Sequence, residues 1–139
     1  MASVQKSIRL QENIVREIEQ LAQERGRDFT AITNELLEEA VKMKRCPGIV
    51  FTEGTSGRRA RIAGTGIEVW ELIGSYKGVG SDYDRLRKAY HWLTDQQLRA
   101  AIGFYLAYPE DVEALLRRNE EVSPEVVRKR HPFLPAGAH

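Results

Sequence analysis

The densest group of side chains that could do chemistry is a run of three arginines, Arg58, Arg59 and Arg61. They directly follow Glu53-Gly54-Thr55-Ser56-Gly57, a cluster of turn-forming residues, so we expect them close to a hairpin turn. Guanidinium groups bind phosphates and carboxylates through paired hydrogen bonds. The cluster is therefore a candidate contact for a phosphate or an acidic protein partner, and the alternative is a solvated loop.

The other reactive side chains do not form a catalytic or metal-binding pattern. Three histidines are scattered along the chain without a matching Ser, Cys or Asp arrangement: His91, His131 and His139. Cys46 has no second cysteine with which to pair, and we interpret it as a linker thiol. Gly64-Thr65-Gly66 lacks the third glycine and the lysine of a phosphate loop, which favours a structural turn. We expect no enzymatic activity, no metal and no cofactor.

Composition sets broad limits on the class of protein. The chain has 139 residues, of which 42% are hydrophobic and 29% charged, as in ordinary soluble domains with one core or two small ones. The net charge of +1 gives no bulk attraction for nucleic acid. Because no apolar run approaches the roughly 20 residues of a membrane span, and no signal-peptide pattern is present, we expect a cytoplasmic protein without membrane contact.

The first 45 residues predict a short strand followed by two helices. Apolar and polar side chains alternate over residues 4–10, and an apolar stripe at helical spacing runs from about Glu12 to Arg25. Gly26 is a typical C-terminal stop, and Asp28 is placed as the N-cap of a second helix that ends before Pro47-Gly48.

A single short strand cannot satisfy its backbone hydrogen bonds alone, and two short helices bury too little apolar surface. We therefore expect two copies of the chain to pair their strands antiparallel and to interlock four helices. This predicts a homodimer or a higher even oligomer.

The rest of the chain predicts a hairpin, a small helical bundle and a tail. Two short apolar runs flank the turn cluster between residues 49 and 62, and helical patterns follow from Glu68 to about residue 118. Thr94 and Gln97 have capping-box spacing, and Pro109 suits the first turn of a helix. We predict a mainly α protein with modules at 1–45 and 46–121, and a basic, proline-containing tail at 122–139 that is extended or becomes ordered only on contact.

The first module resembles ribbon-helix-helix repressors and VapB-type antitoxins. The resemblance rests on the strand Ser7-Ile8-Arg9-Leu10 and on the turn Gly26-Arg27-Asp28-Phe29-Thr30 between the two helices. It implies that the outward strand side chains read bases in the major groove and that the start of the second helix holds a DNA phosphate. The implied base-reading residues are Gln5, Ser7 and Arg9, and the implied phosphate contacts are Phe29 and Thr30.

The second module resembles a small domain family of unknown function with a helix-turn-helix-like fold, which recurs in VapB-type antitoxins encoded beside PIN-like nuclease toxins. The resemblance rests on three ordered blocks: Ala60-Arg61-Ile62-Ala63-Gly64-Thr65-Gly66-Ile67-Glu68-Val69-Trp70, Tyr90-His91-Trp92-Leu93-Thr94 and Tyr108-Pro109-Glu110.

Together these resemblances imply an antitoxin that binds operator DNA as a dimer, represses its own operon and neutralises a PIN-like nuclease. The alternative is a plain ribbon-helix-helix regulator whose second module binds DNA or oligomerises. For the nuclease contact we consider the three arginines of the hairpin together with basic and apolar residues of the tail, because nuclease metal sites are acidic. The candidate tail residues are Arg128, Arg130, Phe133 and Leu134.

Overall fold

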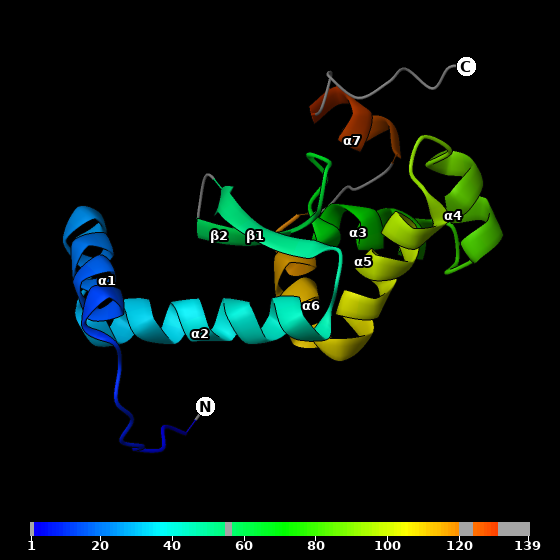
Figure 1. Cartoon of the computed structure of the whole chain (residues 1–139). Coiled ribbons are helices and arrows are strands. Elements are labelled where there is room, and N and C mark those ends of the chain that lie inside the picture. Colours follow the sequence, from blue (N-terminus) through cyan, green and yellow to red (C-terminus); the bar gives the residue numbers. More distant parts are fainter. Residues whose placement is uncertain (1, 55–56, 120–123, 131–139) are drawn as a thin grey trace. The chain divides into compact units, whose positions relative to one another are not determined.

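The computed structural model describes residues 2–54, 57–119 and 124–130, and it divides into two compact units, Met1–Lys42 and Met43–His139. Helices dominate, and the second unit contains a two-stranded antiparallel sheet (Figure 1). The predicted mainly α fold class is therefore confirmed. The strand predicted over residues 4–10 is absent, because in a single chain this segment has no neighbouring strand with which to pair.

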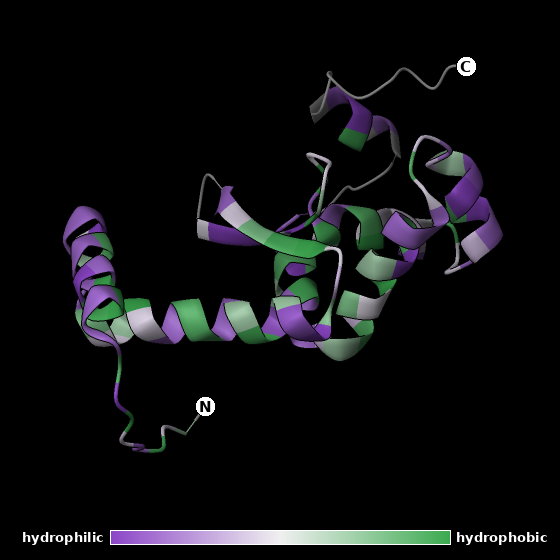
Figure 2. Ribbon diagram, in the orientation of Figure 1, coloured by the Kyte–Doolittle hydropathy of each residue, from purple (hydrophilic) through white to green (hydrophobic). Residues whose placement is uncertain are grey.

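Unit 1 contains two helices joined by a glycine turn: α1 (Glu12–Arg25) and α2 (Phe29–Arg45), which continues past the end of the unit. Gly26 ends α1 in the left-handed conformation at φ 63°, which glycine adopts without steric cost, as predicted. The core of the described part of this unit consists of three residues: Ile18, Ala22 and Ile32. Figure 2 shows hydrophobic residues alternating with hydrophilic ones along α2, as expected of an amphipathic helix.

Unit 2 begins with the predicted hairpin. Strand β1 (Ile49–Gly54) pairs with β2 (Gly57–Ile62) in a register that places Ile49 opposite Ile62, and both of these side chains are buried. The Gly64-Thr65-Gly66 run is a structural turn, as predicted. The Thr65 hydroxyl donates a hydrogen bond to the carbonyl oxygen of Ile62 and accepts one from the backbone N–H of Ile67.

Helices follow the hairpin: α3 (Val69–Gly78), α4 (Tyr83–Ala89), α5 (Asp95–Ala107) and α6 (Pro109–Arg117). The predicted capping box at the start of α5 is present. The Thr94 hydroxyl accepts from the Gln97 N–H at 3.0 Å, and the Gln97 side chain accepts from the Thr94 N–H at 2.9 Å. Pro109 is the first residue of α6, also as predicted. Local signals therefore placed these two helix starts correctly.

The core of unit 2 is formed by the hairpin, by helices α3 to α6 and by helix α7 (Pro124–Arg130). One buried polar contact lies inside it, between the hydroxyls of Ser75 and Tyr90 at 2.8 Å. Cys46, which we interpreted as a linker thiol, is instead buried in this core, and burial raises its pKa. Aromatic side chains of this unit pack in or against the core, among them Trp70, Tyr76, Tyr90, Trp92, Phe104, Tyr105 and Tyr108.

The tail also departs from the sequence prediction. Residues Pro124–Arg130 form helix α7 in place of an extended segment, and Val127 is fully buried in the core of unit 2. Burial of the Val127 side chain stabilises this helix against the rest of unit 2. Among the described residues, no helix is both long and apolar enough to cross a membrane.

Candidate nucleic-acid interface

The three predicted base-reading residues lie in the segment that precedes α1. Gln5, Ser7 and Arg9 are exposed, as is every described residue up to Gln11, the N-cap of α1. Gln11 has extended backbone angles, φ −66° and ψ 144°. Within one chain the segment is thus open to solvent, and nothing orders the three side chains on a common face.

Apolar side chains of the same segment are also exposed. Val4 and Ile8 are 77% and 69% exposed, and Leu10 is 39% exposed. Isolated exposed apolar residues are common on soluble proteins, but here three lie within seven residues. The described residues of the same chain therefore leave the apolar side chains of this segment largely uncovered.

The helices of unit 1 add to this exposed apolar surface. Leu37 and Val41, one turn apart on α2, are 53% and 51% exposed, and Ile14 on α1 is 40% exposed. We call Ile8, Leu10, Ile14, Leu37 and Val41 the unit 1 apolar surface. By comparison, the unit itself buries three apolar residues of its described part, with Leu21, Phe29 and Leu36 partly buried against them.

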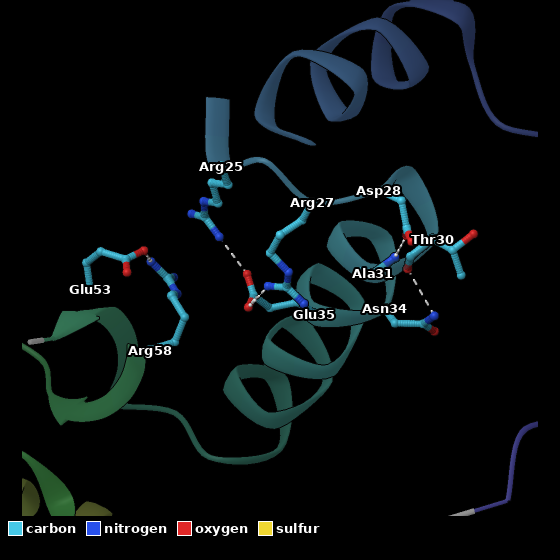
Figure 3. A network of polar contacts seen from close by, with 9 residues as sticks. All are labelled: Arg25, Arg27, Asp28, Thr30, Ala31, Asn34, Glu35, Glu53 and Arg58. Carbon is cyan, nitrogen blue, oxygen red and sulfur yellow. Dashed lines mark hydrogen bonds and ion pairs between the residues drawn. The ribbon is translucent and has the colours of Figure 1, made fainter. Parts of the chain in front are cut away.

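The start of α2 has the geometry of a capped helix. Asp28 accepts a hydrogen bond from the backbone N–H of Ala31 at 2.7 Å, which confirms the predicted N-cap (Figure 3). Asn34 donates to the carbonyl oxygen of Thr30 at 3.0 Å. Phe29 is half-buried and Thr30 is exposed. The helix N-terminus favours an anion, but the Asp28 carboxylate already supplies one negative charge there.

Two arginines brace the turn that leads into α2. Arg25 donates to Glu35 at 2.6 Å and Arg27 donates to the same carboxylate at 2.8 Å (Figure 3). Burial raises the pKa of Glu35, but the hydrogen bonds and charges of Arg27 and Arg25 outweigh that effect and hold the pKa below its ordinary value of 4.5. The contacts tie α1, the turn and α2 together.

The hairpin arginines make contacts within their own unit. Arg58 lies 3.6 Å from Glu53 and donates to the Phe51 carbonyl at 3.2 Å, while Arg59 lies 3.8 Å from Glu68. The Nε of Arg61 is buried, and no described residue accepts a hydrogen bond from it. At least two of the three cations therefore already face carboxylates, which reduces the charge they can offer to a ligand.

The structure describes some of the predicted tail contacts and leaves others outside its described residues. The Arg128 guanidinium lies over the ring of Trp92, 5.1 Å from its centroid. Arg130 is the last residue of α7. Phe133 and Leu134 lie outside the described residues. Of the four residues, the structure therefore places the side chain of Arg128 alone among its described side chains, against Trp92 of unit 2.

Sequence reasoning did not single out a basic group on α4. Arg85, Arg87 and Lys88 are exposed on this short helix, which the Asp82 side chain caps. A turn then leads into α5. The sequence does contain a pattern that could have indicated this group, because three cations occur within four residues shortly after a helix-capping aspartate.

Comparison with known families gave one match. Residues 49–105 match a family described as "Protein of unknown function (DUF433)". The match begins at the first residue of β1 and ends within α5. It covers less than half of the chain and none of unit 1. Searches of curated proteins and of solved structures gave no match.

Proposed function

We propose that this chain is a dimeric repressor that reads operator DNA through unit 1. The unit 1 apolar surface supports this proposal most strongly. A second copy would cover Ile14, Leu37 and Val41, and its own N-terminal segment would supply the strand that residues 4–10 lack. Pairing places alternate residues on opposite faces, so Ile8 and Leu10 would turn inward while Ser7 and Arg9 turn outward.

The outward face then has the chemistry of base recognition. Arg9 can pair with O6 and N7 of guanine, Gln5 with N6 and N7 of adenine, and Ser7 with either base. A two-stranded ribbon is narrow enough to enter the major groove. The backbone amides of Phe29 and Thr30 would hold a phosphate at the start of α2, where the charge of Asp28 weakens the contact.

Binding to the DNA upstream of the chain's own gene tests this role. Arg9→Ala should weaken binding to the operator by about 1–3 kcal/mol per half-site contact. The same variant should bind random DNA nearly as well as the unaltered chain. Thr30→Ala should weaken binding to both DNAs by a similar factor, because a phosphate contact carries no sequence information. Arg9→Lys, which keeps the charge but loses the bidentate geometry, is the matched control. An equal loss on operator and random DNA for Arg9→Ala would contradict base reading.

We also propose that the chain is an antitoxin that neutralises a PIN-like nuclease. The proposal rests on the resemblance of both modules to VapB-type antitoxins and on the basic tail, which suits an acidic metal site. Co-expression with a nuclease encoded beside the gene tests it. The full chain should restore growth, and a chain that lacks residues 123–139 should fail to do so while still binding the operator. Equal rescue by both chains would mean that the nuclease contact lies on the helical module at residues 46–121 and not on the tail.

A second candidate function is a plain regulator whose unit 2 also touches DNA. The observation that favours it is the exposed group Arg85, Arg87 and Lys88 on α4, immediately before the turn into α5. If these cations bind phosphates, replacing all three with glutamine should reduce the slope of log K against log salt by about 3. An unchanged slope would favour the antitoxin role for this unit.

A further inference from the structure

Arg61 differs from the other two arginines of the hairpin because it has no acidic partner. Arg58 and Arg59 lie 3.6 and 3.8 Å from the carboxylates of Glu53 and Glu68. No described residue forms an ion pair or a hydrogen bond with the Arg61 side chain. An arginine that is half-buried and unpaired is unusual, because removing part of the charge from water is unfavourable without a partner.

The end of the Arg61 side chain is open to a ligand. Its Nε is buried, and no described residue accepts a hydrogen bond from it. The two terminal guanidinium nitrogens also have no partner among the described residues, but they are not buried. A ligand can therefore reach these nitrogens from solvent. Paired donors of this kind suit the two oxygens of a carboxylate or of a phosphate.

The hairpin register assigns Arg61 to the face of the sheet that points away from the core. Its neighbours on β2, Ala60 and Ile62, pack in or against the core, and successive side chains of a strand point to opposite faces. On β1, Val50 is opposite Arg61 and Thr52 is the diagonal neighbour, so both share its face. We call Val50, Thr52 and Arg61 the outer hairpin site.

Thr52 is a second unpaired polar residue at this site. Its Oγ1 is buried, and no described residue forms a hydrogen bond with it. Most buried polar atoms in native proteins are hydrogen-bonded, so two unpaired groups on one face of a short hairpin indicate that a group is missing there. Val50 is half-buried and adds an apolar surface beside them.

We propose that the outer hairpin site binds a carboxylate side chain of a partner protein. The Arg61 guanidinium holds the two oxygens, the Thr52 hydroxyl is a further donor after rotation of its side chain, and Val50 contacts an aliphatic neighbour of the acidic residue. The proposal requires neither DNA binding nor a nuclease as the partner, so it stands apart from the repressor and antitoxin roles.

The surroundings favour a single carboxylate over the phosphates of a nucleic acid. Glu68 forms a backbone bridge with Arg61, and its carboxylate would repel a row of phosphates. That carboxylate already accepts from the indole of Trp70 at 2.5 Å, and it lies 3.8 Å from Arg59. Residues 46–121 carry ten basic and eleven acidic side chains, so this segment has no net positive charge to attract nucleic acid.

NMR of the full chain can detect binding through the Arg61 Nε–H resonance and the backbone amides of Val50 and Thr52. The probe is a blocked Val-Asp-Val tripeptide, and a blocked Val-Asn-Val tripeptide is its neutral control. We expect saturable shifts with the aspartate peptide and at least about tenfold weaker binding of the asparagine peptide. Dimethyl phosphate tests a nucleic-acid source. No saturable shift, equal binding of both peptides, or tighter binding of dimethyl phosphate would overturn the proposal.

Variants separate Arg61 from the general charge of the hairpin. Arg61→Met, which keeps a long side chain without charge, should abolish the shifts of the Val50 and Thr52 amides. Thr52→Val should weaken binding by about threefold to tenfold. Arg58→Gln is the matched control, because it removes one charge from the other face of the same strand and should leave binding nearly unchanged.

The stability of the same variants distinguishes a binding role from a structural one. Arg61→Met should leave the urea midpoint of unit 2 unchanged or raise it, because the chain without ligand then no longer carries an unpaired, half-buried charge. A clear fall in this midpoint would show that Arg61 stabilises the fold. Equal weakening of peptide binding by Arg58→Gln and Arg61→Met would show a general charge effect. Either result would overturn the proposal.

Discussion

The two units differ in how completely each one buries its own apolar residues. Unit 2 has a core that draws on the hairpin and on helices α3 to α7. In the described part of unit 1, the buried core residues are Ile18, Ala22 and Ile32, with Leu21, Phe29 and Leu36 partly buried against them. Leu37 and Val41 stay more than half exposed. Because apolar burial is the main favourable term in folding, unit 2 should be stable within one chain, and unit 1 should need a second copy.

The largest effect we expect is the loss of a core ring from unit 2. Phe104 packs edge-on against Phe51 with ring centroids 6.1 Å apart, and against Tyr108 at 5.3 Å. Phe104→Ala should lower the free energy of unfolding by about 3–5 kcal/mol. Urea unfolding followed by tryptophan fluorescence measures this unit, since Trp70 and Trp92 both lie in it. Hydrogen exchange in α1 should stay unchanged. A similar loss of protection from exchange in α1 would show that the two units do not unfold independently.

The buried hydroxyl pair sharpens the account of the unit 2 core. Ser75→Ala should cost about 1–3 kcal/mol, because it leaves the Tyr90 hydroxyl buried without its partner. Tyr90→Phe added to Ser75→Ala should restore most of that loss, since both polar groups are then gone. The same urea titration, followed by tryptophan fluorescence, measures the free energy of unfolding of the single and double variants. Additive losses in the double variant would show that the two hydroxyls are not coupled.

In unit 1 the cap of α2 should have a smaller effect. Asp28→Ala removes the acceptor of the Ala31 N–H and should cost about 1 kcal/mol, whereas Asp28→Ser keeps a capping oxygen and should cost a few tenths. Hydrogen exchange of the first turn of α2 checks both variants. An equal loss for alanine and serine would mean that the charge of Asp28, rather than its cap, stabilises the helix.

The smallest effect should be the acid dependence that Glu35 gives to unit 1. Its folded pKa is lower than 4.5, the ordinary value expected when unfolded, so its contribution is present above about pH 4.5 and is lost as the pH falls through the folded pKa. Glu35→Gln should therefore flatten the acid-side decline of unit 1 by less than about 1 kcal/mol. Hydrogen exchange of α1 and α2 between pH 3 and 6 measures the slope. A steeper decline in the variant would contradict the sign.

Features that depend on neighbours in the sequence were predictable. Gly26 as a helix stop, Asp28 as a cap, the Thr94 and Gln97 box and the hairpin turn each involve groups within a few residues. Their geometry is set by local backbone sterics and hydrogen bonds, which the sequence displays directly.

Features that depend on distant contacts were not predictable from local patterns. Helix α7 forms because Val127 reaches a core made by residues far earlier in the chain, and Arg128 finds Trp92 in the same way. Cys46 is buried for the same kind of reason. The opposite case is the strand over residues 4–10, which was predicted but is absent from the structure. The pattern that predicts this strand requires a partner strand from outside the single chain. The candidate DNA site depends on that partner, and so stays a prediction.

The central claim is that unit 1 is completed by a second copy of the chain, and sedimentation equilibrium of the full chain at micromolar concentration tests it most directly. We predict a dimer that Leu37→Glu combined with Val41→Glu converts to a monomer, with tryptophan emission unchanged because unit 2 stays folded. Leu106→Glu is the matched control, since Leu106 is 74% exposed on α5 of unit 2 and should leave the dimer intact. A monomeric unaltered chain, or a double variant that remains dimeric, would contradict the claim.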